Sequence, residues 1–321
     1  MTQLHKARTS VPLTKASLAY LNKIEDFILF DVAPKRMVKN RSGKIYSYGK
    51  QGMRIVDSAF ATLGRYNKAS LTVEKSDHYF LQQYGLHGDV LNADLEAEDP
   101  IDAETDLSEM LLHMLILDAE KKLADVVTST SNFTNKITLS GNDQWNEYAQ
   151  ADSDPFADLK VARDTVRAAC GFVPNTISMW YNVYSALIDH PDVIARFPGS
   201  SEITRSMLER KLQEVLWFEK LNVGKALYTD SNLGAATEAL TDIWGNDCLV
   251  HYTEKNARLK SLTFAATYMR KGDPIETARI AAKDFLRGAT IGEIYSTVVQ
   301  KLEMDQVIVE ETCAYLIKDA V

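Results

Sequence analysis

The sequence lacks the motifs that identify the common enzyme classes. It contains no glycine-rich dinucleotide fingerprint, no P-loop, no G-x-S-x-G nucleophile motif, no H-E-x-x-H zinc motif and no EF-hand loop. Its six histidines form no i, i+4 pair, and His113 falls in an apolar helical segment, where a core residue is expected. We therefore expect a protein that is not an enzyme, with no catalytic residue, no cofactor and no metal ion.

Cysteine and long apolar segments are also scarce. Cys170, Cys248 and Cys313 are widely spaced and odd in number, which indicates neither a disulfide framework nor a zinc site. We expect three buried, reduced thiols in a cytoplasmic protein. The longest apolar run, residues 110–117, is too short to span a bilayer, and residues 1–21 contain no apolar core of signal-peptide length. The sequence therefore predicts no membrane partner.

Acids are rare in one block of the chain, and basic residues are rare in the next. Residues 1–75 hold 14 Lys and Arg against 5 Asp and Glu, whereas residues 76–159 hold 3 against 18. The net charges of these blocks are +9 and −15, in a chain whose formal net charge is −8. The acidic overall balance argues against a protein that binds nucleic acid with its whole surface.

The basic block predicts a long β-hairpin with little core of its own. Glycines punctuate residues 35–75, and apolar residues alternate at Leu71 and Val73. An isolated two-stranded ribbon is marginal, so it either folds back on the acidic block or lies on the acidic face of a neighbouring copy. The second option predicts self-assembly. The alternative is a stacking platform for single-stranded nucleic acid, although no recognisable module surrounds its residues. These residues are Tyr46, Tyr48 and Tyr66 beside Lys44, Lys50 and Arg65.

The acidic block leads into the clearest helix of the sequence. Asp99 is suited to the N-cap and Pro100 to the first turn, and an apolar face continues to about Ser129, which gives a rod of about 40 Å. The acids at its start suit the helix dipole, whereas a divalent-cation site is the alternative with no matching loop spacing. These acids are Asp94, Glu96, Glu98, Asp99, Asp102, Glu104 and Asp106.

The remaining sequence predicts an α+β protein. A second helix begins at Asp154 and ends at Gly171, and another covers about 204–213. We expect strands at 176–180, 215–219, 223–229, 248–252 and 263–269. Residues 291–317 contain two β-rich runs, with a turn expected near Asp305 and Gln306.

Several short segments, taken in order, resemble one known family. They are F-D-V-A-P at 30–34, S-G-K-I-Y-S-Y at 42–48, D-P-I-D-A-E at 99–104, L-S-G-N-D-Q-W at 139–145, S-D-P at 153–155, G-F-V-P-N-T-I at 171–177, H-P at 190–191 and I-W-G-N at 243–246. Each segment is weakly specific alone. Their order and spacing across nearly the whole chain resemble the tailed-bacteriophage major capsid proteins, which share the Hong Kong 97-like capsid fold.

The resemblance implies a domain layout. Residues 1–29 would be an N-terminal arm and 30–86 an extended β-hairpin loop. The peripheral domain, with a long spine helix, would comprise 87–155 and 286–321, and the axial domain, with a central sheet and flanking helices, 156–285. In this family the loop lies over a neighbouring subunit, which agrees with the charge blocks. We therefore expect Lys44, Lys50, Arg54 and Arg65 to face Glu96, Glu98, Asp102 and Glu104 of a neighbour.

The resemblance also implies a function. The chain would form hexamers and pentamers of an icosahedral phage head that encloses double-stranded DNA without reading its sequence. It would occupy the virion, and the host cytoplasm during assembly. The implied partners are a separate scaffolding protein, a portal and, in some members, a decoration protein. The loop begins about 33 residues from Met1, which leaves no room for a fused scaffolding segment.

Two further expectations concern crosslinking and the alternatives. Some family members join subunits through a loop lysine and an asparagine in the C-terminal strands, but no asparagine follows Asn256 here. We therefore expect no such crosslink. The alternative functions are an encapsulin-like nanocompartment shell protein and, from a different class, an acid-rich metal-dependent hydrolase.

Overall fold

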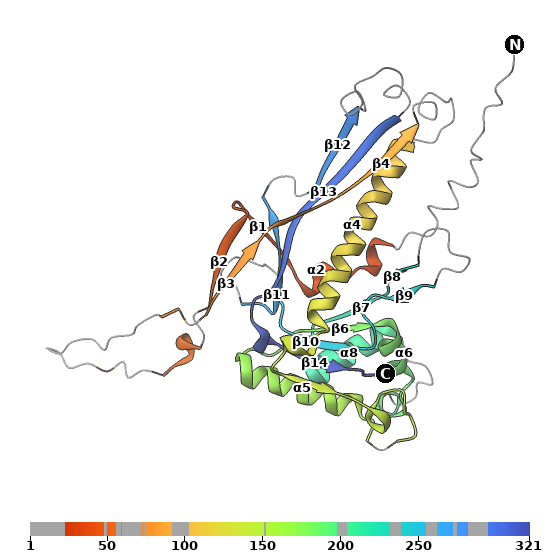
Figure 1. The fold of residues 1–321 in the computed structure, drawn as a ribbon. Coiled ribbons are helices and arrows are strands. Elements are labelled where there is room, and N and C mark those ends of the chain that lie inside the picture. The colour runs from red at the N-terminus through yellow and green to blue at the C-terminus, as the bar shows by residue number, and fades with distance from the viewer. Residues whose placement is uncertain are drawn as a thin grey trace, which may run out of the picture.

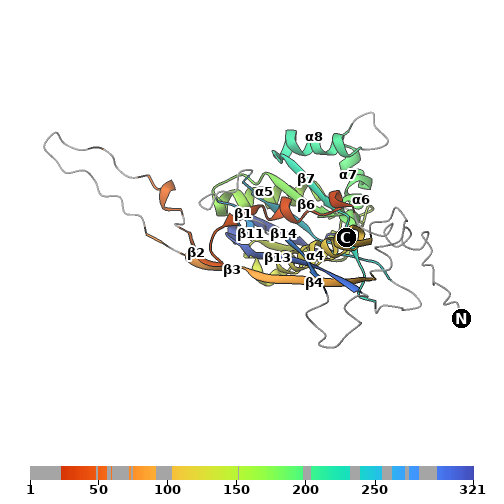
Figure 2. The same cartoon turned by 90° about the horizontal axis from the view of Figure 1, so that it is seen from above.

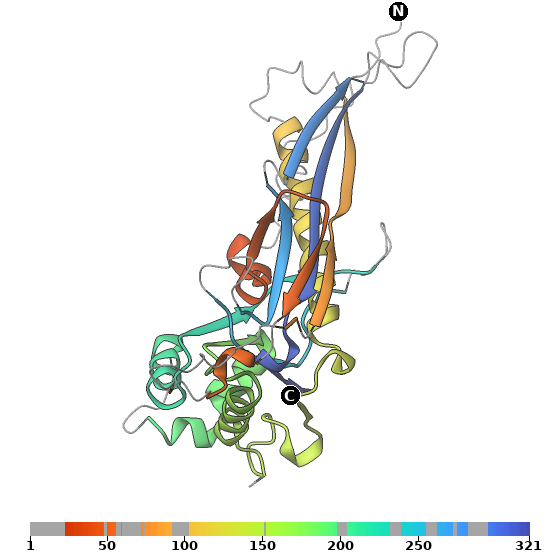
Figure 3. The same cartoon turned by 90° about the vertical axis from the view of Figure 1, so that its left-hand side faces the viewer.

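The computed structural model describes residues 23–47, 50–55, 59, 72–73, 75–91, 103–150, 152–197, 204–231, 239–254, 262–271, 275–281 and 295–321. A long sheet and its helix α4 form one end of this structure, and a shorter sheet with helices α5, α6 and α8 forms the other (Figures 1 and 3). This mixture of helices and sheets agrees with the expected α+β class. Of the helices in these residues, none is long and apolar enough to cross a membrane.

The long sheet is organised around one strand, β13. Two strands pair with one edge of β13 and a third strand pairs with the other edge, all in antiparallel register. A further strand, β1, extends the sheet in parallel with β11. The strands are β1 (Lys35–Val38), β11 (Ala265–Arg270), β13 (Tyr295–Ile308) and β12 (Ile275–Ala281), with β4 (Gln82–Leu91) on the other edge of β13.

The turn expected near Asp305 and Gln306 is wrong. Both residues lie within β13, opposite Tyr268 and Thr267 of β11. Their polar side chains have specific partners, because Asp305 accepts a hydrogen bond from the Phe80 backbone and Gln306 donates one to the carbonyl of Ala119. The chain turns later, at η6 (Glu311–Cys313).

The long helix is confirmed as α4 (Ala103–Val127), which packs on β13 and β4. Its buried apolar residues recur every four positions, so one stripe of the helix faces the sheet. This stripe consists of Leu111, Leu115, Ala119, Leu123 and Val127. The expected cap at Asp99 and Pro100 lies outside the described residues.

The shorter sheet joins strands from distant parts of the sequence. Its β10 and β6 are buried along their whole lengths. In spatial order its strands are β5 (Lys136–Thr138), β14 (Ala314–Lys318), β10 (Cys248–His251), β6 (Thr176–Trp180) and β7 (Lys220–Gly224). The helices around it are α5 (Pro155–Cys170), α6 (Tyr181–Asp189), α7 (Pro191–Ile194) and α8 (Arg205–Leu216).

The boundaries of α5 and α8 show how local signals act. Asp154 caps α5 by accepting from the backbone of Phe156 and Ala157, and Gly171 ends it in the left-handed conformation, as expected. The strand expected at 215–219 is wrong. The helix α8 continues because Leu208, Leu212 and Leu216 extend one buried stripe, and β7 begins only at Lys220.

The hydrogen bonding distributes strands between the two sheets differently from the sequence layout. β11 and β12 fall within residues 156–285 but lie in the long sheet, whereas β5 and β14 come from the segments assigned to the peripheral domain and lie in the shorter sheet. The chain passes from one sheet to the other after β4, after β10 and again after β13. The domain layout stays a prediction, and its sequence boundaries divide each sheet between domains.

A two-stranded hairpin projects from this body (Figures 1 and 2). It pairs β2 (Ser42–Ser47) with β3 (Lys75–Phe80) in antiparallel register. The short elements that complete the described structure are η1 (Ile24–Asp26), α2 (Leu29–Val32), η2 (Gln51–Met53), η3 (Thr130–Asn132), η4 (Gly141–Asp143), β8 (Leu227–Tyr228) and β9 (Thr241–Asp242).

Candidate assembly surface

The projecting hairpin carries exposed basic residues. Lys44 lies on β2, and Lys50 and Arg54 flank η2. All three are exposed, and none forms an ion pair with an acid in the described part of the chain. A charged ribbon of this kind favours contact with an acidic surface of another molecule.

Five of the expected contact residues are not positioned by the structure. Arg65, Glu96, Glu98 and Asp102 lie outside the described residues, and Glu104 belongs to the first turn of α4 with its side chain undescribed. The pairing between loop and acidic block therefore stays a prediction. The stacking platform also stays untested, since Tyr46 lies exposed on β2 while Tyr48 and Tyr66 are outside the described ranges.

The hairpin also exposes apolar side chains beyond its base. Tyr46 and Met53 are each about half exposed, and Ile55 is fully exposed. Met53 lies against the end of α5, where its thioether would collide with any side chain placed on Gly171. Exposed apolar residues on a projecting element are typical of a protein-interaction surface.

The base of the hairpin is fastened to the long sheet through Glu303. Its carboxylate is 3.0 Å from Arg41 Nη2 and 3.4 Å from Arg270 Nη1, and it accepts a further hydrogen bond from Gln83. The hydrogen bonds from Gln83 and Arg41 hold the pKa of Glu303 below its usual value. Sequence reasoning missed this residue because its partners are distant in the chain.

A small core supports the same base. The rings of Tyr79 and Tyr268 stack with centroids 4.6 Å apart, and the buried Arg36 donates to the Tyr268 hydroxyl at 3.3 Å. Val38 and Leu81 complete the packing. The base of the hairpin is thus fixed on its own subunit, while its exposed surface remains available to another.

Glu120 is a buried acidic residue of α4 with three hydrogen-bond donors. Its carboxylate accepts hydrogen bonds from Ile28 N at 3.0 Å, Leu29 N at 2.8 Å and Trp244 Nε1 at 2.7 Å. Trp244 in turn stacks on Trp180 of β6, with ring centroids 4.2 Å apart. Burial raises the pKa of Glu120 to about 7. This one carboxyl therefore connects α4, the segment before β1 and the shorter sheet.

No enzyme-like site emerges from the described residues. Within them, no group of three or more His, Cys, Asp or Glu side chains could hold a metal ion. His251 is buried between Ser178 Oγ, at 2.9 Å, and Thr253 Oγ1, at 2.7 Å, and burial lowers its pKa to about 3. His113 packs edge-on against Phe27. Both arrangements are structural.

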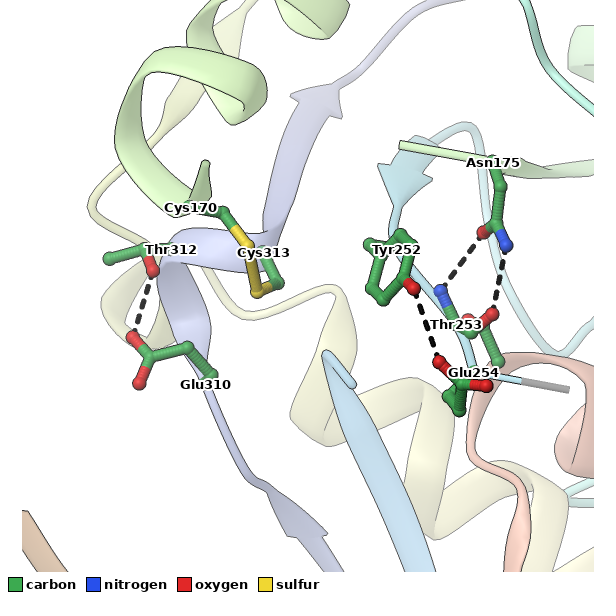
Figure 4. Close-up of a disulfide and its surroundings, with 8 residues drawn as sticks. All are labelled: Cys170, Asn175, Tyr252, Thr253, Glu254, Glu310, Thr312 and Cys313. Carbon is green, nitrogen blue, oxygen red and sulfur yellow. Dashed lines mark hydrogen bonds between the residues drawn. A yellow bond between two sulfur atoms is a disulfide. The ribbon is translucent and has the colours of Figure 1, made fainter. Parts of the chain in front are cut away.

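The cysteines correct one expectation from the sequence. All three are buried, but Cys170 and Cys313 are joined as a disulfide, with their Cα atoms 5.1 Å apart, and Cys248 alone is free (Figure 4). A separation of 143 residues hid this pair, since only the fold brings the two residues together. Burial raises the pKa of the Cys248 thiol, which makes it unreactive.

The chain has relatives among known proteins. It matches the model of a family described as phage major capsid protein E over residues 111–284, more than half of its length. It is 26% identical over 291 residues to the major capsid protein of Burkholderia phage BcepMu, covering 87% of this chain and 90% of that protein.

Solved structures show the same fold. A phage-related protein from Bordetella bronchiseptica RB50 has a TM-score of 0.70 and 22% identity, covering 98% of this chain and 99% of that one. The capsid of Cyanophage P-SCSP1u has a TM-score of 0.56 and 12% identity, covering 99% and 92%.

These findings confirm the resemblance drawn from the short segments. The fold is that of phage capsid shells, in agreement with the expected Hong Kong 97-like class, and the family consists of structural proteins that are not enzymes. The chain belongs to the phage major capsid protein E family, and its role is that of a capsid shell protein of the virion.

Proposed function

We propose that this chain assembles into hexamers and pentamers that close an icosahedral phage head around double-stranded DNA. The observation that carries the proposal is the projecting β2–β3 hairpin, which is fixed at its base and exposes basic and apolar residues beyond it. Membership of a phage capsid family supports the same conclusion and favours it over an encapsulin-like nanocompartment.

The proposed layout keeps the arm (1–29) and limits the extended loop to the projecting hairpin from β2 to β3, since β1 and β4 pair within the long sheet. It defines the other two parts by their sheets. The peripheral part is the long sheet with α4, which includes β11 and β12. The axial part is the shorter sheet with α5 to α8, which includes β5 and β14. The partners that we propose are a separate scaffolding protein, a portal and a decoration protein, with assembly in the host cytoplasm.

In the assembled shell, the basic residues of the loop face acids of a neighbouring subunit. The proposed contacts join Lys44, Lys50, Arg54 and Arg65 to Glu96, Glu98, Asp102 and Glu104. An exposed ion pair contributes only about 0.2–1 kcal/mol, but a shell repeats the contact in every subunit. The Debye length falls to about 3 Å at 1 M salt, so these contacts weaken there.

Charge reversal tests the contact directly. Lys44→Glu combined with Arg54→Glu should abolish or strongly reduce shell formation in negative-stain micrographs, while circular dichroism of the subunit stays unchanged. Lys160→Glu on α5, an exposed residue outside the hairpin, is the control for added negative charge. Restoration of shells by Glu98→Lys with Glu104→Lys would support direct pairing. A structure of the shell with these basic residues in bulk solvent would refute it.

Microscopy and nuclease treatment test the wider proposal. Purified particles should be closed shells, and particles from infected cells should protect double-stranded DNA from nuclease. A chain that stays monomeric at high concentration with a scaffolding protein supplied would contradict assembly. Packaged protein in place of DNA would support the nanocompartment instead.

A further inference from the structure

We propose that Cys170 and Cys313 form a redox-dependent disulfide. Both are thiols while the shell is assembled, and they are oxidised to the disulfide after the particle leaves the cell. The timing rests on the proposed capsid function. The pairing rests on the fold, which places the two residues together at the junction of the two sheets.

One cysteine lies beside the shorter sheet, and the other lies in the link between the two sheets. Cys170 is the last residue of α5, which packs on the shorter sheet. Cys313 ends η6, the corner through which the chain passes from β13 to β14 (Figure 4). A bond between them therefore joins the end of a helix to the link between the sheets.

The junction is held in place without the disulfide. The carbonyl of Cys313 accepts a hydrogen bond from Tyr252 N at 2.9 Å, and Gly171 N donates to the carbonyl of Arg167 at 2.9 Å. Asn175 bonds both backbone groups of Thr253, at 3.0 and 2.9 Å, next to the pair (Figure 4). Because hydrogen bonds hold the backbone at Cys313 and next to Cys170, we expect the subunit to fold and assemble with the thiols reduced.

The compartment determines when the bond forms. The bacterial cytosol keeps thiols reduced, whereas the medium outside the cell is oxidising. Cys170 is 5% exposed and precedes the exposed Gly171, whereas Cys313 is fully buried. An oxidant therefore reaches Cys170 first.

The chemistry is thiol–disulfide exchange with a small-molecule disulfide such as oxidised glutathione. The Cys170 thiolate attacks one sulfur of that disulfide, forms a mixed disulfide and displaces one thiolate. The Cys313 thiolate then attacks the Cys170 sulfur and displaces the second. Two protein thiols lose two protons and two electrons, and one small disulfide is reduced to two thiols. Cys248 lies in β10 without a partner cysteine and stays a thiol.

Mass spectrometry of the full chain tests this proposal. Cells lysed directly into denaturant and N-ethylmaleimide should give subunits with all three cysteines alkylated. Purified particles incubated with oxidised glutathione before the same treatment should be alkylated only at Cys248. The midpoint of thermal unfolding should then rise by roughly 4–10 °C, as expected for one disulfide in a chain of this size. Dithiothreitol should reverse the rise.

Matched variants distinguish the effect of the Cys170–Cys313 disulfide from that of oxidation elsewhere in the chain. Cys248→Ser should retain the rise in the midpoint, whereas Cys170→Ser and Cys313→Ser should each lose it. If a serine variant fails to fold, the native chain with and without dithiothreitol still decides the question.

Three outcomes would overturn the proposal. The first is a Cys170–Cys313 disulfide already complete in the subunits trapped at lysis. The second is alkylation of Cys170 and Cys313 in particles already incubated with oxidised glutathione. The third is a disulfide that forms but leaves the midpoint of thermal unfolding unchanged. Micrographs of the same samples report shell formation separately. If no closed shells form, the capsid proposal fails. The masses of the soluble subunits still show whether the Cys170–Cys313 disulfide forms.

Discussion

Glu120 places one ionisable group where three parts of the chain meet. Its pKa is raised from 4.5 to about 7, because burial disfavours the carboxylate more than its three hydrogen-bond donors favour it. The folded state therefore binds this proton more tightly than the unfolded state. Stability from Glu120 is fully present below pH 4.5 and is lost as the pH rises through about 7.

Glu120→Gln should remove this dependence on pH. Between about pH 5 and pH 8, the free energy of unfolding of the native chain should fall by on the order of 2–3 kcal/mol more than that of the variant. Urea denaturation of the dissociated subunit at both pH values measures the difference, in which other titrating groups cancel. Asp125→Asn, which removes an exposed carboxylate from the same helix, should leave the dependence unchanged. Equal pH dependence in the native chain and Glu120→Gln would show that Glu120 does not titrate in this range.

At the scale of elements, α5 depends on its first residue outside the helix. Asp154→Ala removes the acceptor for the Phe156 and Ala157 backbone groups and should lower the free energy of unfolding by about 1 kcal/mol. Asp154→Asn keeps an acceptor and should lower it by much less. Asp152→Ala, two residues earlier and exposed, is the control for lost charge. Urea denaturation distinguishes the three, and an Asp154→Ala variant as stable as the control would contradict the capping role.

Local patterns predicted the elements whose signals are local. The long helix α4, the cap and the terminal glycine of α5, and the strand at 176–180 are confirmed because each depends on neighbours in the sequence. The turn near Asp305 failed because polar residues that usually mark turns here bind distant partners within a strand. The disulfide, Glu303 and Glu120 could not be found from the sequence, since their partners lie between 33 and 262 positions away.

At the scale of the whole molecule, the absence of asparagine after Asn256 has a direct consequence. Mature particles should contain no lysine–asparagine crosslink between subunits, because the C-terminal strands supply no acceptor side chain. Boiled particles with reductant should give a single band near 36.0 kDa on a denaturing gel. A ladder of multimers under these conditions would contradict this expectation.

The central position of β13 determines how the subunit bears force. The strand runs along the length of the long sheet and continues through the corner at Cys313 into β14 (Figure 1). Its hydrogen bonds to β4, β12 and β11 lie across the strand. Tension along the molecule therefore acts on many of these bonds in shear and at once, whereas a pull across the sheet would open them one after another. If internal pressure stretches the proposed shell, β13 therefore transmits the tension along each subunit, and the corner at Cys313 passes it on to β14.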